Sequence, residues 1–342
     1  MMDQFSLSLL GVIGTAATVV ILVCGLRMTG LADRIADRTG LGEALIGGVL
    51  LGAATSFSGT VVSATAALDG RASLAFSNAI GGIAAQTAFL AIADMVYRKA
   101  NLEHAAAELA NLYQCGLLLL LLAVPVAAFA APEVAMFGVH PASVILILLY
   151  IYGVKTTAQL RDAPMWEPVE TEQTQPDTPD ETDSADKPAT GLIFVFVGLM
   201  CIMGVAGWAI ASVASVVIDR FDVSESVVGA LSTAVLTSLP ELVTTLAAVR
   251  RGALQLAVGG IIGGNTFDIL FLTVSDAGYR DGSIYHAITQ ADLFWLAVAM
   301  LMTAVLLLGL IFREKHGPAR IGRESMALLV IYLGAIGVQS FG

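Results

Sequence analysis

The chain contains ten apolar stretches of roughly 20 residues, and this feature limits its fold more than any other. A helix needs about 20 apolar residues to cross a hydrocarbon core of about 30 Å. The sequence therefore predicts an all-α integral membrane protein with ten transmembrane helices, at residues 5–27, 40–67, 73–97, 107–131, 138–157, 190–217, 224–249, 254–277, 286–312 and 321–341.

The distribution of charge supports a membrane protein and argues against several other classes. Charged residues make up 13% of the 342-residue chain, whereas soluble domains carry about 25%. The 17 lysines and arginines form no basic stripe of the kind that binds nucleic acid. Cys24, Cys115 and Cys201 lie in separate apolar stretches without metal or disulfide spacing, so we expect them to be buried as small apolar side chains. The N-terminus lacks a basic region, which favours a retained first helix over a cleaved signal peptide.

Lysine and arginine are distributed unequally between the two sets of loops that ten helices would create. The loops after the first, third, fifth, seventh and ninth stretches hold 14 of these residues, and the opposite side holds only Arg71, Arg220 and Arg280. Basic loops favour the cytoplasmic side of a membrane. We therefore expect a multi-pass protein of the cell (plasma) membrane with both termini extracytoplasmic. The acidic tract within 158–189, rich in Pro, Glu, Asp and Thr, is then a disordered cytoplasmic linker.

The acidic linker divides the ten stretches into five and five, and the two halves resemble each other. Residues 43–98 align without a gap with residues 225–280 at an offset of 182, with 17 identities in 56 positions. The identities include Thr-Ser, Gly-Gly, Asp, Tyr and Arg, which shared apolar composition does not produce. Five helices per half would insert the copies in opposite senses, as in secondary transporters. The predicted parts are one five-helix repeat at 1–157, the linker at 158–189 and an inverted repeat at 190–342.

Polar residues interrupt corresponding helices in both halves and predict a cation site at the bilayer midplane. Pro240 cannot donate a helical hydrogen bond, so carbonyl groups one turn earlier are left unpaired. Hard cations prefer oxygen ligands, and carboxylates inside a membrane usually mark functional sites. The alternative is that these carboxylates only join packed helices by hydrogen bonds. The candidate cation ligands are Glu241, Asp268, Thr237, Ser238, Thr55, Ser56, Asn265 and Gln86, of which Glu241 and Asp268 are the carboxylates that would hold a transported cation rather than a fixed cofactor.

At these residues the chain resembles a known family. The segments TSLPELVTTLAAVRRG and LAVGGIIGGNTFDIL, with the ten stretches and the central linker, look like the sodium/calcium exchangers of the cation/calcium antiporter superfamily. The resemblance implies cation exchange by alternating access, in which the first and sixth helices move against the other eight. It implies that Glu241 is a central ion ligand with Asp268 beside it. Further oxygen ligands would come from Thr237, Ser238, Thr55 and Ser56.

The first repeat departs from the family pattern at positions that would carry the chemistry. Gly59 stands where the second repeat has Glu241, and Gln86 stands where it has Asp268. A dication held by one carboxylate fewer loses several kcal/mol of Coulomb attraction, for a distance of ~4 Å and an effective dielectric of ~20. We therefore expect weaker Ca²⁺ selectivity and a shift toward monovalent or proton-coupled exchange. Two further replacements are Ser58 for Pro240 and Ile83 for Asn265.

Three classes of function are compatible with these patterns to different degrees. A secondary cation antiporter fits best, and a channel or a non-exchanging relative is the alternative because the first repeat has lost ligands. An enzyme is disfavoured, since the sequence has no nucleotide loop, Ser/His pair or His/Glu metal cluster. We expect no cofactor, and we expect Na⁺, Ca²⁺ or H⁺ and the lipid bilayer as partners. The sequence leaves the oligomeric state open.

Four acidic residues near helix ends are assigned roles outside the cation site. Glu43 and Glu225 open their helices, where a carboxylate favours the N-terminal dipole. Asp94 and Asp276 are each followed by Tyr and Arg three and four residues later, which predicts an interfacial anchor with a local ion pair.

Overall fold

The structure is a bundle of long helices. The computed structural model describes residues 2–39, 52, 54–97, 99–136, 138–169, 171, 190–317 and 321–341, and over these residues it contains no strand beyond one isolated bridge. The longer helices are α1 (Leu7–Thr39), α3 (Phe57–Leu68), α4 (Ala72–Tyr97), α6 (Leu109–Ala130), α7 (Pro141–Asp162), α8 (Thr190–Phe221), α11 (Leu239–Arg251), α12 (Leu254–Asp268), α14 (Gln290–Phe312) and α15 (Arg323–Phe341). The short ones are η1 (Met2–Gln4), α5 (Leu102–Ala105), α9 (Glu225–Val227), η2 (Val228–Thr233), α10 (Ala234–Thr237) and α13 (Phe271–Gly278).

Within the described ranges, seven helices are long and apolar enough to cross a membrane, or eight if the bent pair Glu225–Thr237 and Leu239–Arg251 is one span. The prediction of an all-helical membrane protein is therefore confirmed at this level. The helix α3 is a shorter apolar segment, and α15 is not among the seven. Residues 40–51 and 53 of the predicted stretch 40–67, which include Glu43, and residues 170 and 172–189 of the acidic tract lie outside the described residues.

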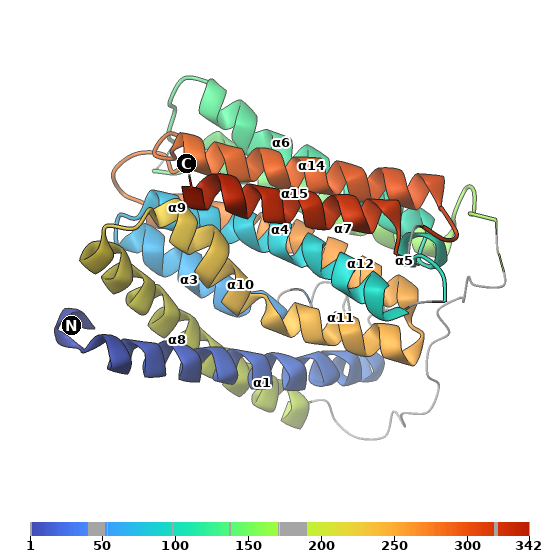
Figure 1. Ribbon diagram of the computed structural model, residues 1–342, viewed down its shortest axis with the longest axis horizontal. Coiled ribbons are helices and arrows are strands. Elements are labelled where there is room, and N and C mark those ends of the chain that lie inside the picture. The colour runs from blue at the N-terminus through green and yellow to red at the C-terminus, as the bar shows by residue number, and fades with distance from the viewer. Residues whose placement is uncertain are drawn as a thin grey trace.

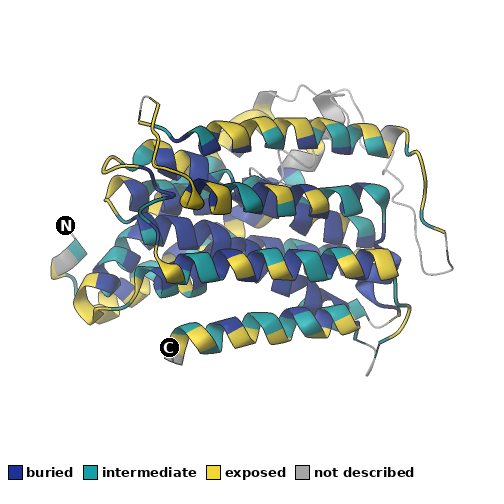
Figure 2. Ribbon diagram, turned by 90° about the horizontal axis from the view of Figure 1, so that it is seen from above, coloured by how far each residue is buried: buried dark blue, intermediate teal, exposed yellow. Residues whose placement is uncertain are grey.

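The helix α4 lies at the centre of the bundle (Figure 1). Figure 2 shows that buried residues gather on the inner helices and that the outer helices carry most of the exposed ones. The apolar window of α4 is 83% buried inside the protein, and that of α12 and α13 is 72% buried, whereas α1 and α8 reach only 28%. A helix that is apolar all round is suited to such a central position. In Figure 1, α1 and α8 form an outer layer on one side of α4, and α14, α15 and α6 lie on the other.

Glycine allows α4 to approach the second half of the chain very closely. A Cβ atom at Gly81 would collide with the backbone of Ala230, and one at Gly229 would collide with Ser77. Small residues at helix interfaces let backbones approach within a membrane bundle. The close approach explains why polar groups of α4 reach the helices that follow residue 225.

Asp94 and Asp276 are fully buried, and both accept hydrogen bonds from backbone N–H groups. The predicted ion pair between Asp276 and Arg280 is not among the ion pairs of the described residues, so that prediction is wrong for Asp276. Asp94 accepts two backbone hydrogen bonds, of 2.6 and 2.7 Å, and Asp276 accepts two of 3.3 and 2.7 Å. The arrangement recurs at the offset of 182 residues. The donors are Leu102 and Gly322 for Asp94, and Ile284 and His140 for Asp276.

One position distinguishes these two carboxylate clusters. In the Asp276 cluster, Ser143 lies 2.9 Å from the hydroxyl of Tyr285. At the offset of 182, Ser325 donates a 2.7 Å hydrogen bond to Glu103 instead. The Asp94 cluster therefore contains a second carboxyl group where the Asp276 cluster has a phenol.

Glu103 should make stability depend on pH. Burial, then the nearby charges of Asp94 and Glu324, raise its pKa from 4.5 to about 7, against a hydrogen bond from Ser325. The folded protein holds the Glu103 proton more tightly than the unfolded chain does. The stabilisation that this proton contributes is therefore fully present below pH 4.5 and is lost as the pH rises to about 7. The upward shift in the pKa of Glu103 corresponds to about 3 kcal/mol in the free energy of unfolding. We expect Glu103→Gln to abolish this loss of stability in unfolding measurements in detergent between pH 5 and 8. Glu167→Gln, which changes an exposed residue, is the control and should retain the loss. An unchanged dependence of stability on pH in Glu103→Gln would contradict the assignment.

Candidate functional site

The site is built around the break between α10 and α11. The helix α10 ends at Thr237, α11 begins at Leu239, and the two segments are bent by 46°. Pro240 lies at the start of α11, as expected for a residue that fits the first helical turn but cannot continue a preceding helix. The break places Glu241 in the first turn of α11, where the positive end of the helix dipole favours negative charge.

Gln86 of α4 joins the broken helix to Asp268, the last residue of α12. Its amide nitrogen donates to Oγ of Ser238 at 3.1 Å and to Oδ2 of Asp268 at 2.6 Å. Gln86 and Asp268 are the residues that correspond at the offset of 182. In a two-fold arrangement, a residue contacts its own equivalent only near the axis.

Two hydroxyl-bearing residues of the chain before α3 lie near the carboxylates. Thr55 lies near Glu241, Ser56 lies near Asp268, and the two carboxylates are close enough to repel each other. Glu241 is 5% exposed and Asp268 is 2% exposed. The broken helix, α4, α12 and the start of α3 therefore bring their oxygens to one buried place.

Many of these oxygens have no hydrogen-bond partner within the described part of the chain. Buried acceptors are normally paired, and each orphan calls for a reason such as an ion. Neither carboxylate forms an ion pair with a described basic residue, and no three described His, Cys, Asp or Glu side chains cluster as a resident metal centre. The donor set of carboxylate, amide and hydroxyl oxygens suits a hard cation in transit. The unpaired atoms are both Glu241 oxygens, Asp268 Oδ1, Ser56 Oγ, Gln86 Oε1 and Asn265 Oδ1.

The structure brings six of the eight predicted ligands together and gives the other two different partners. The six are Glu241, Asp268, Ser238, Thr55, Ser56 and Gln86. Asn265 donates instead to Thr87 Oγ1 at 3.0 Å, although its own oxygen stays unpaired. The Thr237 hydroxyl donates to backbone carbonyls of its own helix, at 2.9 and 3.2 Å. Thr237 therefore helps to shape the break before Glu241.

An aromatic ring occupies the place where the first repeat lacks a carboxylate. A Cβ atom at Gly59 would lie 2.7 Å from Cε2 of Phe271 and 3.6 Å from Oγ1 of Thr237. Phe271 is 4% exposed and forms an edge-to-face contact with Phe267. Gly59 is thus a steric partner of Phe271, and no side chain fits there unless the ring moves.

Asn78 is a site-supporting residue that the sequence prediction missed. Its amide nitrogen donates to the Gly59 carbonyl at 3.1 Å and to Ser63 Oγ at 2.9 Å, and its oxygen accepts from Thr233 at 2.7 Å. Asn78 is almost fully buried and ties α3, α4 and η2 together. The only signal for Asn78 in the sequence was a single amide within an apolar stretch. The comparison of the two halves did not mark it, because the equivalent residue in the second half is Gly260.

A broken membrane helix that presents a buried carboxylate to unpaired oxygens on neighbouring helices is typical of ion transporters. A profile of the sodium/calcium exchanger protein family matches residues 9–158 and 190–341. The chain belongs to the sodium/calcium exchanger family.

Individual relatives agree with this placement. The inner membrane protein YrbG of Escherichia coli (strain K12) is 33% identical over 140 residues, which is 40% of this chain and 42% of YrbG, so less than half of each protein is aligned. A solved structure of the sodium-calcium exchanger NCX_Mj matches 97% of this chain and 99% of its own, with a TM-score of 0.61 and 19% identity. The H⁺/Ca²⁺ exchanger CAX matches 97% of this chain and 86% of its own, with a TM-score of 0.67 and 10% identity. Identities this low show a shared fold.

Proposed function

We propose that the protein is a secondary active cation antiporter that carries its ion past Glu241 and Asp268 by alternating access. The observation that carries this function is the pair of buried carboxylates whose oxygens lack partners in the described chain. Such a pair is costly to bury unless a cation neutralises it. A transported cation would supply that charge in each cycle.

The charge of the site is compatible with Ca²⁺ as one cargo. Glu241 and Asp268 together supply two negative charges, which balance one dication or two monovalent ions. NCX_Mj is named a sodium-calcium exchanger and CAX an H⁺/Ca²⁺ exchanger, so Na⁺ and H⁺ are the candidate counter-ions. Gly59 favours the second candidate function, a monovalent cation/proton exchanger without Ca²⁺ transport, because the first repeat adds no carboxylate of its own.

The proposed architecture has ten transmembrane helices in two inverted five-helix repeats, at 1–157 and 190–342. Three features at the offset of 182 support it: the aligned sequences, the direct contact between Gln86 and Asp268, and the matched backbone partners of Asp94 and Asp276. The excess of basic residues on one set of loops supports extracytoplasmic termini and a cytoplasmic acidic linker in a cell-membrane protein.

Flux measurements in liposomes test the function directly. The full chain is reconstituted, radioactive Ca²⁺ is added outside, and vesicles are preloaded with Na⁺, with acid buffer, or with a non-transported cation. We expect uptake only when an outward Na⁺ or H⁺ gradient is present, and none in empty vesicles. Ca²⁺ that enters without a counter-ion gradient would indicate a channel. Na⁺/H⁺ exchange without Ca²⁺ uptake would establish the second candidate.

A further inference from the structure

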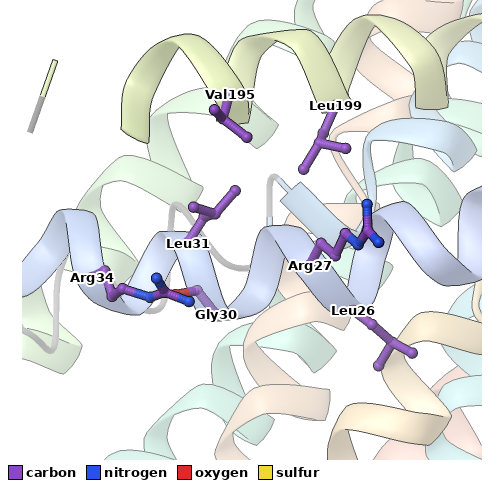
Figure 3. A pocket seen from close by; sticks show the side chains of 7 residues that line it. All are labelled: Leu26, Arg27, Gly30, Leu31, Arg34, Val195 and Leu199. Carbon is purple, nitrogen blue, oxygen red and sulfur yellow. The ribbon is translucent and has the colours of Figure 1, made fainter. Parts of the chain in front are cut away.

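A cleft of about 330 Å³ opens between α1 and α8 (Figure 3). Figure 3 shows Leu31 of α1 directed toward α8, and Val195 and Leu199 of α8 directed toward α1. Gly30 of α1 also lines the cleft, and a Cβ atom added there would meet nothing within 4 Å. The cleft is therefore open space with apolar sides, and the absence of a side chain at residue 30 helps to keep it open.

Two arginines of α1 border the cleft. Arg27 and Arg34 are seven residues apart, so they share one face of the helix at a separation of about 10 Å along its axis. The Nε atom of Arg34 donates to the Gly30 carbonyl at 3.1 Å, which folds this guanidinium back toward Arg27. Among the described residues that line the cleft there is no carboxylate. Guanidinium groups match the geometry of phosphate oxygens, so the cleft is suited to a phosphate.

The charged and apolar side chains of the cleft lie next to each other at the ends of two apolar spans. The apolar span of α1 ends at Met28, so Arg27 lies in its last turn and Arg34 lies beyond it, and the apolar span of α8 begins at Gly191, shortly before Val195. In Figure 3, Arg27 lies at the same end of the cleft as Leu199, and Arg34 lies beyond Leu31. A phospholipid likewise joins an anionic phosphate to apolar acyl chains.

We propose that this cleft binds one anionic phospholipid, with its phosphate between Arg27 and Arg34 and an acyl chain against Val195 and Leu199. Basic pockets between transmembrane helices on the cytoplasmic side attract such lipids, and the excess of basic residues on this set of loops matches that side. A bound lipid would touch α1 and α8 together and would hold this outer pair of helices as one unit.

Lipid retention by the full purified chain tests the proposal. Native mass spectrometry counts bound dioleoylphosphatidylglycerol and, in parallel, dioleoylphosphatidylcholine. We expect the double variant Arg27→Gln/Arg34→Gln to bind phosphatidylglycerol at least tenfold more weakly. The matched control is Arg250→Gln/Arg251→Gln, which removes the same charge from exposed arginines at the end of α11 and should retain the lipid.

A second variant separates the cleft from its charge. Gly30→Leu keeps both arginines and fills the open space, and we expect it to lose the lipid as well, with an unchanged melting temperature. Equal losses in both arginine double variants would overturn the proposal in favour of general surface charge. Equal retention of both lipids, or displacement of phosphatidylglycerol by millimolar inorganic phosphate, would overturn the assignment to a lipid. Retention that appears only after deletion of residues 172–187 would show that the acidic tract occupies the cleft.

Discussion

Replacing Glu241 with glutamine is expected to reduce exchange by roughly 100-fold or more. The variant keeps the side-chain length and one oxygen but removes one of the two charges that balance the cation. At about 4 Å and an effective dielectric of about 20, that charge contributes about 4 kcal/mol per unit of cation charge, or about three decades in affinity before other groups compensate. The measurement is the initial rate of counter-ion-driven uptake in liposomes at equal protein density.

Two further variants make this result interpretable. Glu167→Gln applies the same chemical change at an exposed residue outside the helices and should leave exchange unchanged. Asp268→Asn should also impair transport, because Asp268 faces Glu241 and accepts the hydrogen bond of Gln86. If a well-folded Glu241→Gln protein exchanged within about threefold of the parent, the carboxylate would be a packing group and the proposed ion path would be wrong.

The sequence predicts most of the helices because their signal is local. Apolar length located α4, α6, α8, α14 and the span formed by α12 and α13 within a few residues, since a membrane span needs little information beyond hydropathy. The break before Glu241 was also predictable, because Pro240 lacks an N–H group whatever its surroundings. The candidate carboxylates Glu241 and Asp268 could be named from the sequence as well, because charge inside an apolar stretch is expensive and is rarely kept without a role.

The contacts between distant segments were not predictable in the same way. The donors to Asp276 come from His140 and Ser143 at the start of α7 and from Ile284 before α14, so they depend on how these segments pack. The sequence offered only the adjacent Tyr279 and Arg280. The role of Asn78 depends on Gly59 and Thr233, which lie 19 and 155 residues away. Such pairings are set by the close approach of α4 and η2, which no local pattern of residues reports.

The relation between Gly59 and Phe271 leads to a prediction about ion selectivity. Gly59→Glu alone should express poorly, since its Cβ would lie 2.7 Å from the Phe271 ring and overpacking a core costs about 1–3 kcal/mol. The double variant Gly59→Glu/Phe271→Ala removes that clash and adds a third carboxylate beside Thr237, at the break in the helix that precedes Glu241. Because a dication gains twice the Coulomb energy of a monovalent ion from each added charge, the double variant should favour Ca²⁺.

The informative comparison is between Gly59→Glu/Phe271→Ala and Gly59→Gln/Phe271→Ala. Both carry the same cavity from the lost ring, which costs about 3–5 kcal/mol of stability, and both add a side chain of the same size, so they differ in charge alone. We expect the Ca²⁺ concentration for half-maximal uptake to be at least tenfold lower in the glutamate variant, with a smaller change for Na⁺. Equal Ca²⁺ dependence in the two variants would mean that residue 59 lies away from the ion, and that the missing carboxylate of the first repeat has no part in selectivity. A large difference would show that a carboxylate at residue 59 contributes to ion selectivity, and that its absence from the first repeat weakens the preference for Ca²⁺.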